Sequence, residues 1–218
     1  MTLFSSLLSK VAIKDKENST HIKHPKKKHP QGSSRYTLRQ SLKNKLAAGT
    51  VLRDSVKCPE NEDENEWIAM LVIESYNNMI NSYEFIQQFC TDQTCPQMNG
   101  AKAVYYWTEG KGKPQELPAH QYIDKLTNWI NEQIDNPDIF PVGGSNFSKT
   151  FKANVSKIIS RMLRVYAHIY YAHWEHIKTL NVDGHVNTLL KHLQYFAEEF
   201  GLIGEKDKSV MKHVFDTL

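Results

Sequence analysis

Cysteines, long apolar runs and targeting signals are scarce in this sequence. It has three cysteines among 218 residues, too few for the disulfide framework of a small secreted domain. It has no run of about 18 apolar residues, which excludes a membrane-spanning helix. Its first residues, MTLFSSLLSKVAI, lack the basic lead and the cleavage site of a secretory signal. We therefore expect a protein of the cytoplasm and nucleus, where thiols stay reduced.

Positive charge is concentrated at the start of the chain. Residues 1–50 hold eleven lysines and arginines against two acids, a net +9, so the remaining residues carry −6 within the total of +3. The stretch KHPKKKHPQGSS has no apolar periodicity and cannot build a core. We predict a flexible basic tail over residues 1–35 and one folded domain over 36–218. Nucleic-acid binding through the tail is the weaker interpretation, because the domain itself is acidic.

Helical periodicity dominates the rest of the chain. A helix that starts near Trp67 has one apolar face, formed by Ala69, Val72, Tyr76, Met79, Tyr83 and Ile86. The pattern predicts further helices over residues 120–135, 151–176, 187–200 and 206–218. Residues 103–107 and 115–119 flank a segment rich in Gly, Lys and Pro and predict a short β-hairpin. The expected fold is mostly α, with a helix bundle as its core.

Two of the three cysteines stand five positions apart, and histidines follow far along the chain. Cys90 and Cys95, with two of His168, His173 and His176, would make the Cys2His2 set that zinc prefers. Ordinary buried cysteines and core histidines are the alternative. His168 and His173 diverge by about 140° on a regular helix, so they can share a metal only if the helix tightens, ends or bulges between them. His173 and His176 would share a face more easily, and spacing leaves the pair open.

A catalytic zinc has little support in the sequence. HExxH is absent, and so is the H-x-E motif with a following C-x-x-C of the zinc deaminases. Four protein ligands would also leave no open position for a water molecule. The site therefore looks structural, with a zinc-dependent hydrolase or deaminase as the alternative.

Two charged patterns lie outside this cluster. Lys157, Arg161, Arg164 and His168 fall within an arc of roughly 60° on the predicted helix. Such a stripe is usually a solvated face, yet arginine pairs also bind phosphate. Residues 60–66 contain five acids, which either favour the start of the helix near Trp67 or meet a basic partner.

Five segments, in order along the chain, resemble the signature segments of the Mob (Mps one binder) family of kinase co-activators: ENEDENEWIAM, EFIQQFCTDQTCPQM, LPAHQYIDKLTNWI, RMLRVYAHIYYAH and GHVNTLLKHLQYFAEEFGLI. The match runs from about Tyr36 to Leu218. YTLRQSLKNKLAAGTVL resembles the founding branch, whereas YYAHW and GHVNTL are similar to the second branch. The resemblance implies a four-helix-bundle core with flanking helices, a short β-hairpin and one structural zinc. It also implies a non-enzymatic adaptor for NDR/LATS-type AGC kinases in Hippo or mitotic-exit signalling.

The resemblance also assigns residues by matching motifs. The family's zinc ligands fall on Cys90, Cys95, His168 and His173. Its pocket for a phosphothreonine peptide of a Ste20-like kinase or scaffold falls on Arg161 and Arg164, with Lys157 one turn earlier and the uncharged Ser160 at the third basic position. Its acids that meet a basic helical segment of the kinase fall on Glu62 and Glu66.

Overall fold

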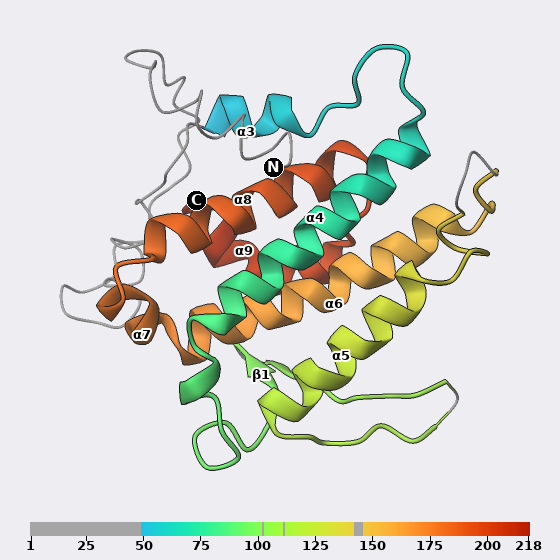
Figure 1. The fold of residues 1–218 in the computed structure, drawn as a ribbon. Helices are drawn as coiled ribbons and strands as arrows, with labels where there is room; N and C mark the ends of the chain where they lie inside the picture. The colour runs from blue at the N-terminus through green and yellow to red at the C-terminus, as the bar shows by residue number, and fades with distance from the viewer. Residues whose placement is uncertain (1–48, 102, 111, 142–145) are drawn as a thin grey trace.

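A computed structural model describes residues 49–101, 103–110, 112–141 and 146–218 of the chain. Among these residues it has seven α-helices, one turn of 3₁₀ helix and one two-stranded antiparallel sheet, which confirms the mostly helical prediction (Figure 1). The predicted tail and the predicted start of the domain near Tyr36 lie outside the described residues. None of the described helices has the length and apolar character needed to cross a membrane.

The elements follow one another in this order: α3 (Gly49–Ser55), α4 (Glu64–Glu84), η1 (Gln87–Phe89), β1 (Asn99–Gly100), β2 (Ala103–Val104), α5 (Ala119–Ile134), α6 (Phe151–Ala172), α7 (Trp174–Thr179), α8 (Asp183–Glu199) and α9 (Glu205–Phe215).

Helix α6 lies at the centre of the fold. It packs against α4, α5, α8, α9 and β1, while α4 also packs on α8 and α3 lies along α8 (Figure 1). The apolar side of α6 is fully buried at Val155, Ile159, Met162 and Tyr166. Every functional residue predicted on this helix is therefore held by a rigid and well-packed element.

Helix α4 starts three residues before the position that periodicity indicates. Asp63 is its N-cap, and its carboxylate accepts hydrogen bonds from the backbone N–H of Asn65 at 2.9 Å and of Glu66 at 3.0 Å. A carboxylate at this position accepts hydrogen bonds from backbone N–H groups that have no partner within the first turn. Its negative charge also interacts favourably with the positive end of the helix dipole. The cap therefore extends the helix to Glu64, ahead of its first apolar residue.

The prediction of one helix over residues 151–176 is wrong. Helix α6 ends at Ala172, and His173 has φ −125° and ψ 13°, outside the helical region, before α7 begins at Trp174. Periodicity missed the break because the apolar pattern continues through it, with Trp174 and Ile177 buried. The break is what turns the His173 side chain toward the cysteines, as described below.

The predicted hairpin is confirmed at one residue pair, Trp107 and Gln115, which exchange two backbone hydrogen bonds at 2.8 Å. The paired strands are β1 and β2, with Asn99 opposite Val104, and segments 103–107 and 115–119 meet only at an isolated bridge between Trp107 and Gln115. The second segment pairs with the loop after α4 instead. The N–H of Met98 donates to the Leu117 carbonyl, and that of Ala119 to the Cys95 carbonyl, both at 3.0 Å. These backbone groups are therefore not free to form a hairpin ladder.

Candidate functional site

Four side chains of types that can bind metals converge at the end of α6. The donor atoms of Cys90, Cys95, His168 and His173 all lie within 4.8 Å of one another. All four residues are buried, with His168 fully enclosed and Cys95 the most exposed at 6%. Residues far apart in the sequence thus form a buried Cys2His2 group that could hold a metal ion.

The loop after α4 aims both sulfurs at the same point. Cys90 follows η1, and the next residues close a tight turn in which the N–H of Cys95 donates to the Thr91 carbonyl at 2.8 Å. The Thr94 hydroxyl fastens this turn by donating to the Phe89 carbonyl at 2.6 Å. The five-residue spacing of the cysteines therefore encodes one turn with both thiols on its inner side.

The two histidines face the two sulfurs in pairs. His168 Nε2 lies 3.5 Å from Cys90 Sγ, and His173 Nε2 lies 3.2 Å from Cys95 Sγ. They can converge because α6 ends between them, which is one of the three conditions stated above. His176 lies outside the group, and its ring stacks on Phe89 with 4.1 Å between the centroids.

Hydrogen bonding and burial prepare these side chains for a metal. His168 Nδ1 donates to the Asn99 carbonyl at 2.9 Å, so the lone pair of Nε2 faces the sulfurs. Burial lowers the pKa of His168, and burial with the neighbouring histidines lowers the pKa of His173 to about 4. Both rings are therefore neutral at physiological pH, the form that binds metals.

The environment of the thiols favours their protonated form. Burial, followed by the neighbouring Cys95, raises the pKa of the Cys90 thiol to about 12. A divalent cation at this point would favour the thiolates and displace their protons. The donor set of two sulfurs and two imidazoles thus fits a metal of intermediate softness.

Arg161, in the middle of α6, is clamped between two tryptophans. Its guanidinium lies 4.7 Å from the ring centroid of Trp107 and 4.0 Å from that of Trp129 on α5. Its Nη1 is buried and has no hydrogen-bond partner among the described residues. Cation–π contacts therefore fix this arginine in place and leave donor capacity unused.

Arg164 is held in a similar way, one turn further along. Its Nη1 donates to the Tyr122 hydroxyl at 2.8 Å, and its guanidinium lies over the Tyr105 ring at 5.3 Å. Lys157 is exposed and makes no ion pair or hydrogen bond with another described residue. His168, the last member of the predicted stripe, belongs to the buried Cys2His2 group. We call the remaining three residues, Lys157, Arg161 and Arg164, the basic cluster.

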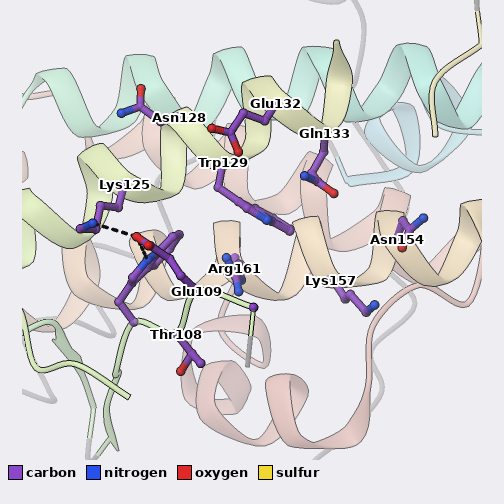
Figure 2. A pocket seen from close by; sticks show the side chains of 12 residues that line it. Thr108, Glu109, Lys125, Asn128, Trp129, Glu132, Gln133, Asn154, Lys157 and Arg161 are labelled. Carbon is purple, nitrogen blue, oxygen red and sulfur yellow. Dashed lines mark hydrogen bonds and ion pairs between the residues drawn. The ribbon is translucent and has the colours of Figure 1, made fainter. Parts of the chain in front are cut away.

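Two cavities share the wall formed by Lys157 and Arg161. The first, the α6–α9 cavity, has a volume of about 550 Å³ and is lined by Ser156, Lys157, Ser160, Arg161, Arg164, residues 201–204 and Asp207. The second, of about 770 Å³, lies between α5 and α6 (Figure 2). In that view Trp129 lies over Arg161, and Lys125 on α5 pairs with Glu109 at 2.8 Å. The basic cluster thus lies between two hollows that a peptide could enter.

The aromatic clamps and one acid were missed by the sequence reasoning. Trp107 and Trp129 are far from Arg161 in the sequence, and no spacing rule links them. Asp207, on the first turn of α9, accepts a hydrogen bond from the Ser160 hydroxyl at 3.0 Å and brings a negative charge into the α6–α9 cavity. In the sequence, Asp207 is marked only by its place near the start of a predicted helix, where helix capping alone would explain an acid.

The acids of residues 60–66, at the start of α4, differ in their contacts. Asp63 provides the cap, while Glu62 and Glu66 are exposed. The carboxylates of Glu62 and Glu66 form no hydrogen bond or ion pair within the part of the chain that the structure describes. Capping therefore accounts for one acid of the run and leaves these two available to a partner.

Comparison with known proteins gives consistent matches over most of the chain. Residues 43–211 match the model of the Mob1/phocein family. The chain is 66% identical to "MOB kinase activator-like 2" of Dictyostelium discoideum over 218 residues, the full length of both. It is 38% identical to human "MOB kinase activator 3A" over 211 residues, 95% of this chain and 97% of that protein. It is 37% identical to "MOB kinase activator-like 1A" of Arabidopsis thaliana over 198 residues, 89% of this chain and 92% of that protein.

Proposed function

This chain belongs to the Mob1/phocein family, and we propose that it is a non-catalytic adaptor and co-activator of an NDR/LATS-type AGC kinase. It joins the regulatory region of that kinase to a phosphothreonine peptide of an upstream Ste20-like kinase or scaffold, in Hippo or mitotic-exit signalling. The names of its relatives, which describe kinase activators, support a role in kinase activation. We further propose that it acts in the cytoplasm and nucleus, in keeping with its free thiols.

The single observation that carries the phosphopeptide part is the fixed state of Arg161 and Arg164. Both guanidiniums are held against aromatic rings beside the α6–α9 cavity, so little side-chain entropy is lost when they bind an anion. Both side chains are only half-buried and line that cavity, so a phosphate there could accept charge-assisted hydrogen bonds from them. A merely solvated stripe would need neither the aromatic clamps nor a cavity.

The kinase part rests on Glu62 and Glu66. These acids stand exposed at the start of α4, next to a helix that is already capped by Asp63. Free surface acids of this kind steer a basic segment by raising its association rate, more than by adding affinity. A basic helix from the kinase could therefore dock along the start of α4.

The Cys2His2 group is proposed to hold a structural zinc. Zinc would supply the charge that stabilises the thiolates of Cys90 and Cys95. The chain's own residues then fix the fold: the Asn99 carbonyl orients His168, and the break after α6 presents His173. Four buried protein donors leave no position for a substrate, so the hydrolase or deaminase alternative is not favoured.

The phosphopeptide role is tested by titrating the full chain with matched phosphorylated and unphosphorylated threonine peptides. The double variant Arg161→Ala with Arg164→Ala should weaken binding of the phosphorylated peptide by at least about 100-fold, because each charge-assisted contact is worth roughly 1.5–3 kcal/mol. Lys212→Ala, which removes an exposed cation at the other end of α9, is the control and should bind normally. Equal binding of both peptides to the parent chain would contradict the role.

The kinase role is tested by reversing charge at Glu62 and Glu66 to lysine and measuring association with a basic regulatory segment of an NDR/LATS-type kinase. We expect an association rate lower by roughly tenfold at low salt and a weaker dependence on ionic strength. The same two charges reversed at Glu84 and Glu199, which are also exposed, provide the control. Equal slowing in both variants would mean that only the overall charge matters.

A further inference from the structure

We propose that Asp207 makes the α6–α9 cavity selective for phosphothreonine peptides that carry a lysine or arginine beside the phosphothreonine. This rests on the phosphopeptide role proposed above and names the class of peptide that the site accepts. The cavity has one unusual feature, a carboxylate among residues that would otherwise suit an anion.

Asp207 is held in the cavity but is not neutralised there. It is half-buried on the first turn of α9, and one oxygen accepts the Ser160 hydroxyl at 3.0 Å. Within the described residues it forms no ion pair with Lys157, Arg161, Arg164 or any other cation. A carboxylate with one neutral partner keeps most of its charge available to a ligand.

Two of the three cations that line the cavity are held by contacts with other parts of the protein. Arg161 is clamped between Trp107 and Trp129, and Arg164 is tied to Tyr122. These contacts draw both guanidiniums toward α5, whereas Asp207 belongs to α9. The cavity therefore has a positive wall along α6 and a negative point on α9, with Ser160 between them.

A dianionic phosphate alone does not match this arrangement. It is attracted by the positive wall but is repelled by Asp207 at close range. A neighbouring lysine or arginine on the peptide would pair with Asp207 and turn the repulsion into an attraction. A volume of about 550 Å³ lies within the range that binds small ligands, and it accepts more than one side chain. The same acid disfavours polyanions such as nucleic acid.

The proposal is tested with two phosphothreonine peptides that differ only next to the phosphothreonine, where one carries lysine on both sides and the other glutamine. Each is also made without phosphate, and the dissociation constants are measured with the full chain. The parent chain should bind the lysine phosphopeptide roughly five- to tenfold more tightly than the glutamine one. Asp207→Asn, which keeps an acceptor for Ser160, should reduce this ratio to about two or less.

Asp216→Asn is the matched control, because it removes an exposed acid from the other end of α9 and changes the net charge equally. It should retain the parent ratio. An unchanged ratio in Asp207→Asn, or no preference in the parent chain, overturns the proposal while phosphate-dependent binding still supports the phosphopeptide role. Binding that does not depend on phosphate for either peptide overturns the phosphopeptide role itself. Thermal melting of each variant shows that the comparison is made between folded proteins.

Discussion

Two clusters of polar side chains, one in the middle of helix α6 and one at its end, are built in opposite ways. The Cys2His2 group at its end is buried, from the fully enclosed His168 to Cys95 at 6% exposure. The basic cluster in its middle is open to solvent at Lys157 and half-buried at Arg161 and Arg164. In the first cluster polar groups face one another inside the protein, whereas in the second they face ring surfaces, one hydroxyl and a cavity.

The difference separates what each cluster can contribute. Buried polar groups cost free energy unless they are paired, so the first cluster is tied to the stability of the fold. The basic cluster is already supported by the aromatic rings, and its half-buried guanidiniums line the α6–α9 cavity, where they can bind a ligand. Changes to the first cluster should therefore be measured as melting temperature, and changes to the second as affinity.

The largest expected effect comes from removing the proposed metal. Cys90→Ser, or treatment of the parent chain with a strong zinc chelator, should lower the melting temperature by about 10 °C or more. A structural zinc contributes its binding free energy to folding, and each kcal/mol lost shifts a domain of this size by roughly 2–4 °C. Differential scanning calorimetry measures the shift, and elemental analysis should find about one zinc per chain.

Cys58→Ser is the internal control for this experiment, since Cys58 lies outside the Cys2His2 group and is partly exposed. It should melt as the parent chain does and retain its zinc. Equal melting of the Cys90 and Cys58 variants would mean that the four side chains are only a buried polar contact.

The convergence of the four side chains of the Cys2His2 group could be predicted only in part. Helical periodicity gave the main helices because burial repeats along each of them. Spacing could not choose between His168 with His173 and His173 with His176, because the choice depends on where α6 ends. The structure brings together the four donors that the family motifs indicated, and their role as ligands stays a prediction until zinc is measured.

The surroundings of the basic cluster could not be predicted. The sequence predicted the cluster because its residues lie on one helix and recur with the helical period. Trp129 and Asp207 come from other helices, and their contacts with Arg161 and Ser160 depend on how those helices pack. Local patterns identify which residues share a face, but not what lies opposite that face.

A second prediction tests how tightly the fold is packed around the Cys2His2 group. In Gly100→Ala the added Cβ would lie 2.6 Å from the Ala167 Cβ, so β1 would have to move away from α6. We expect a loss of about 1–3 kcal/mol and weaker zinc retention, because the adjacent Asn99 carbonyl orients His168. Gly204→Ala, which would meet no atom within 4 Å, is the control for melting and for zinc competition. Parent-like behaviour of both variants would contradict this account.

A third, smaller effect is the free-energy cost of burying one carboxylate, that of Glu74. Burial raises the pKa of Glu74 from 4.5 to about 7, so the folded chain keeps a proton that the unfolded chain has lost. Stability should therefore fall as pH rises through this window. Because the side chain is partly solvated, we expect Glu74→Gln to gain only about 1 kcal/mol at pH 8 and nothing at pH 4. Melting curves across this range, with the exposed Glu84→Gln as control, measure it; a gain independent of pH would indicate another cause.

The smallest effect is expected beside the basic cluster, where Ser160 occupies a position that is basic in the family motif. In Ser160→Lys the new ammonium would face Asp207, its present hydrogen-bond partner, and would neutralise the acid while adding a cation to the α6–α9 cavity. Phosphothreonine-peptide affinity should rise by only about threefold, because part of the new charge is used by Asp207 and the site is open to solvent. Ser156→Lys adds the same charge one turn earlier on the same cavity wall and should gain less. The melting temperature should stay within about 2 °C of the parent chain, since the new ammonium would replace the hydrogen bond that the half-buried Ser160 gives to Asp207. If Ser160→Lys instead altered melting as strongly as loss of a cysteine ligand, the basic cluster would belong to the fold, and the division between the two clusters of α6 would be wrong.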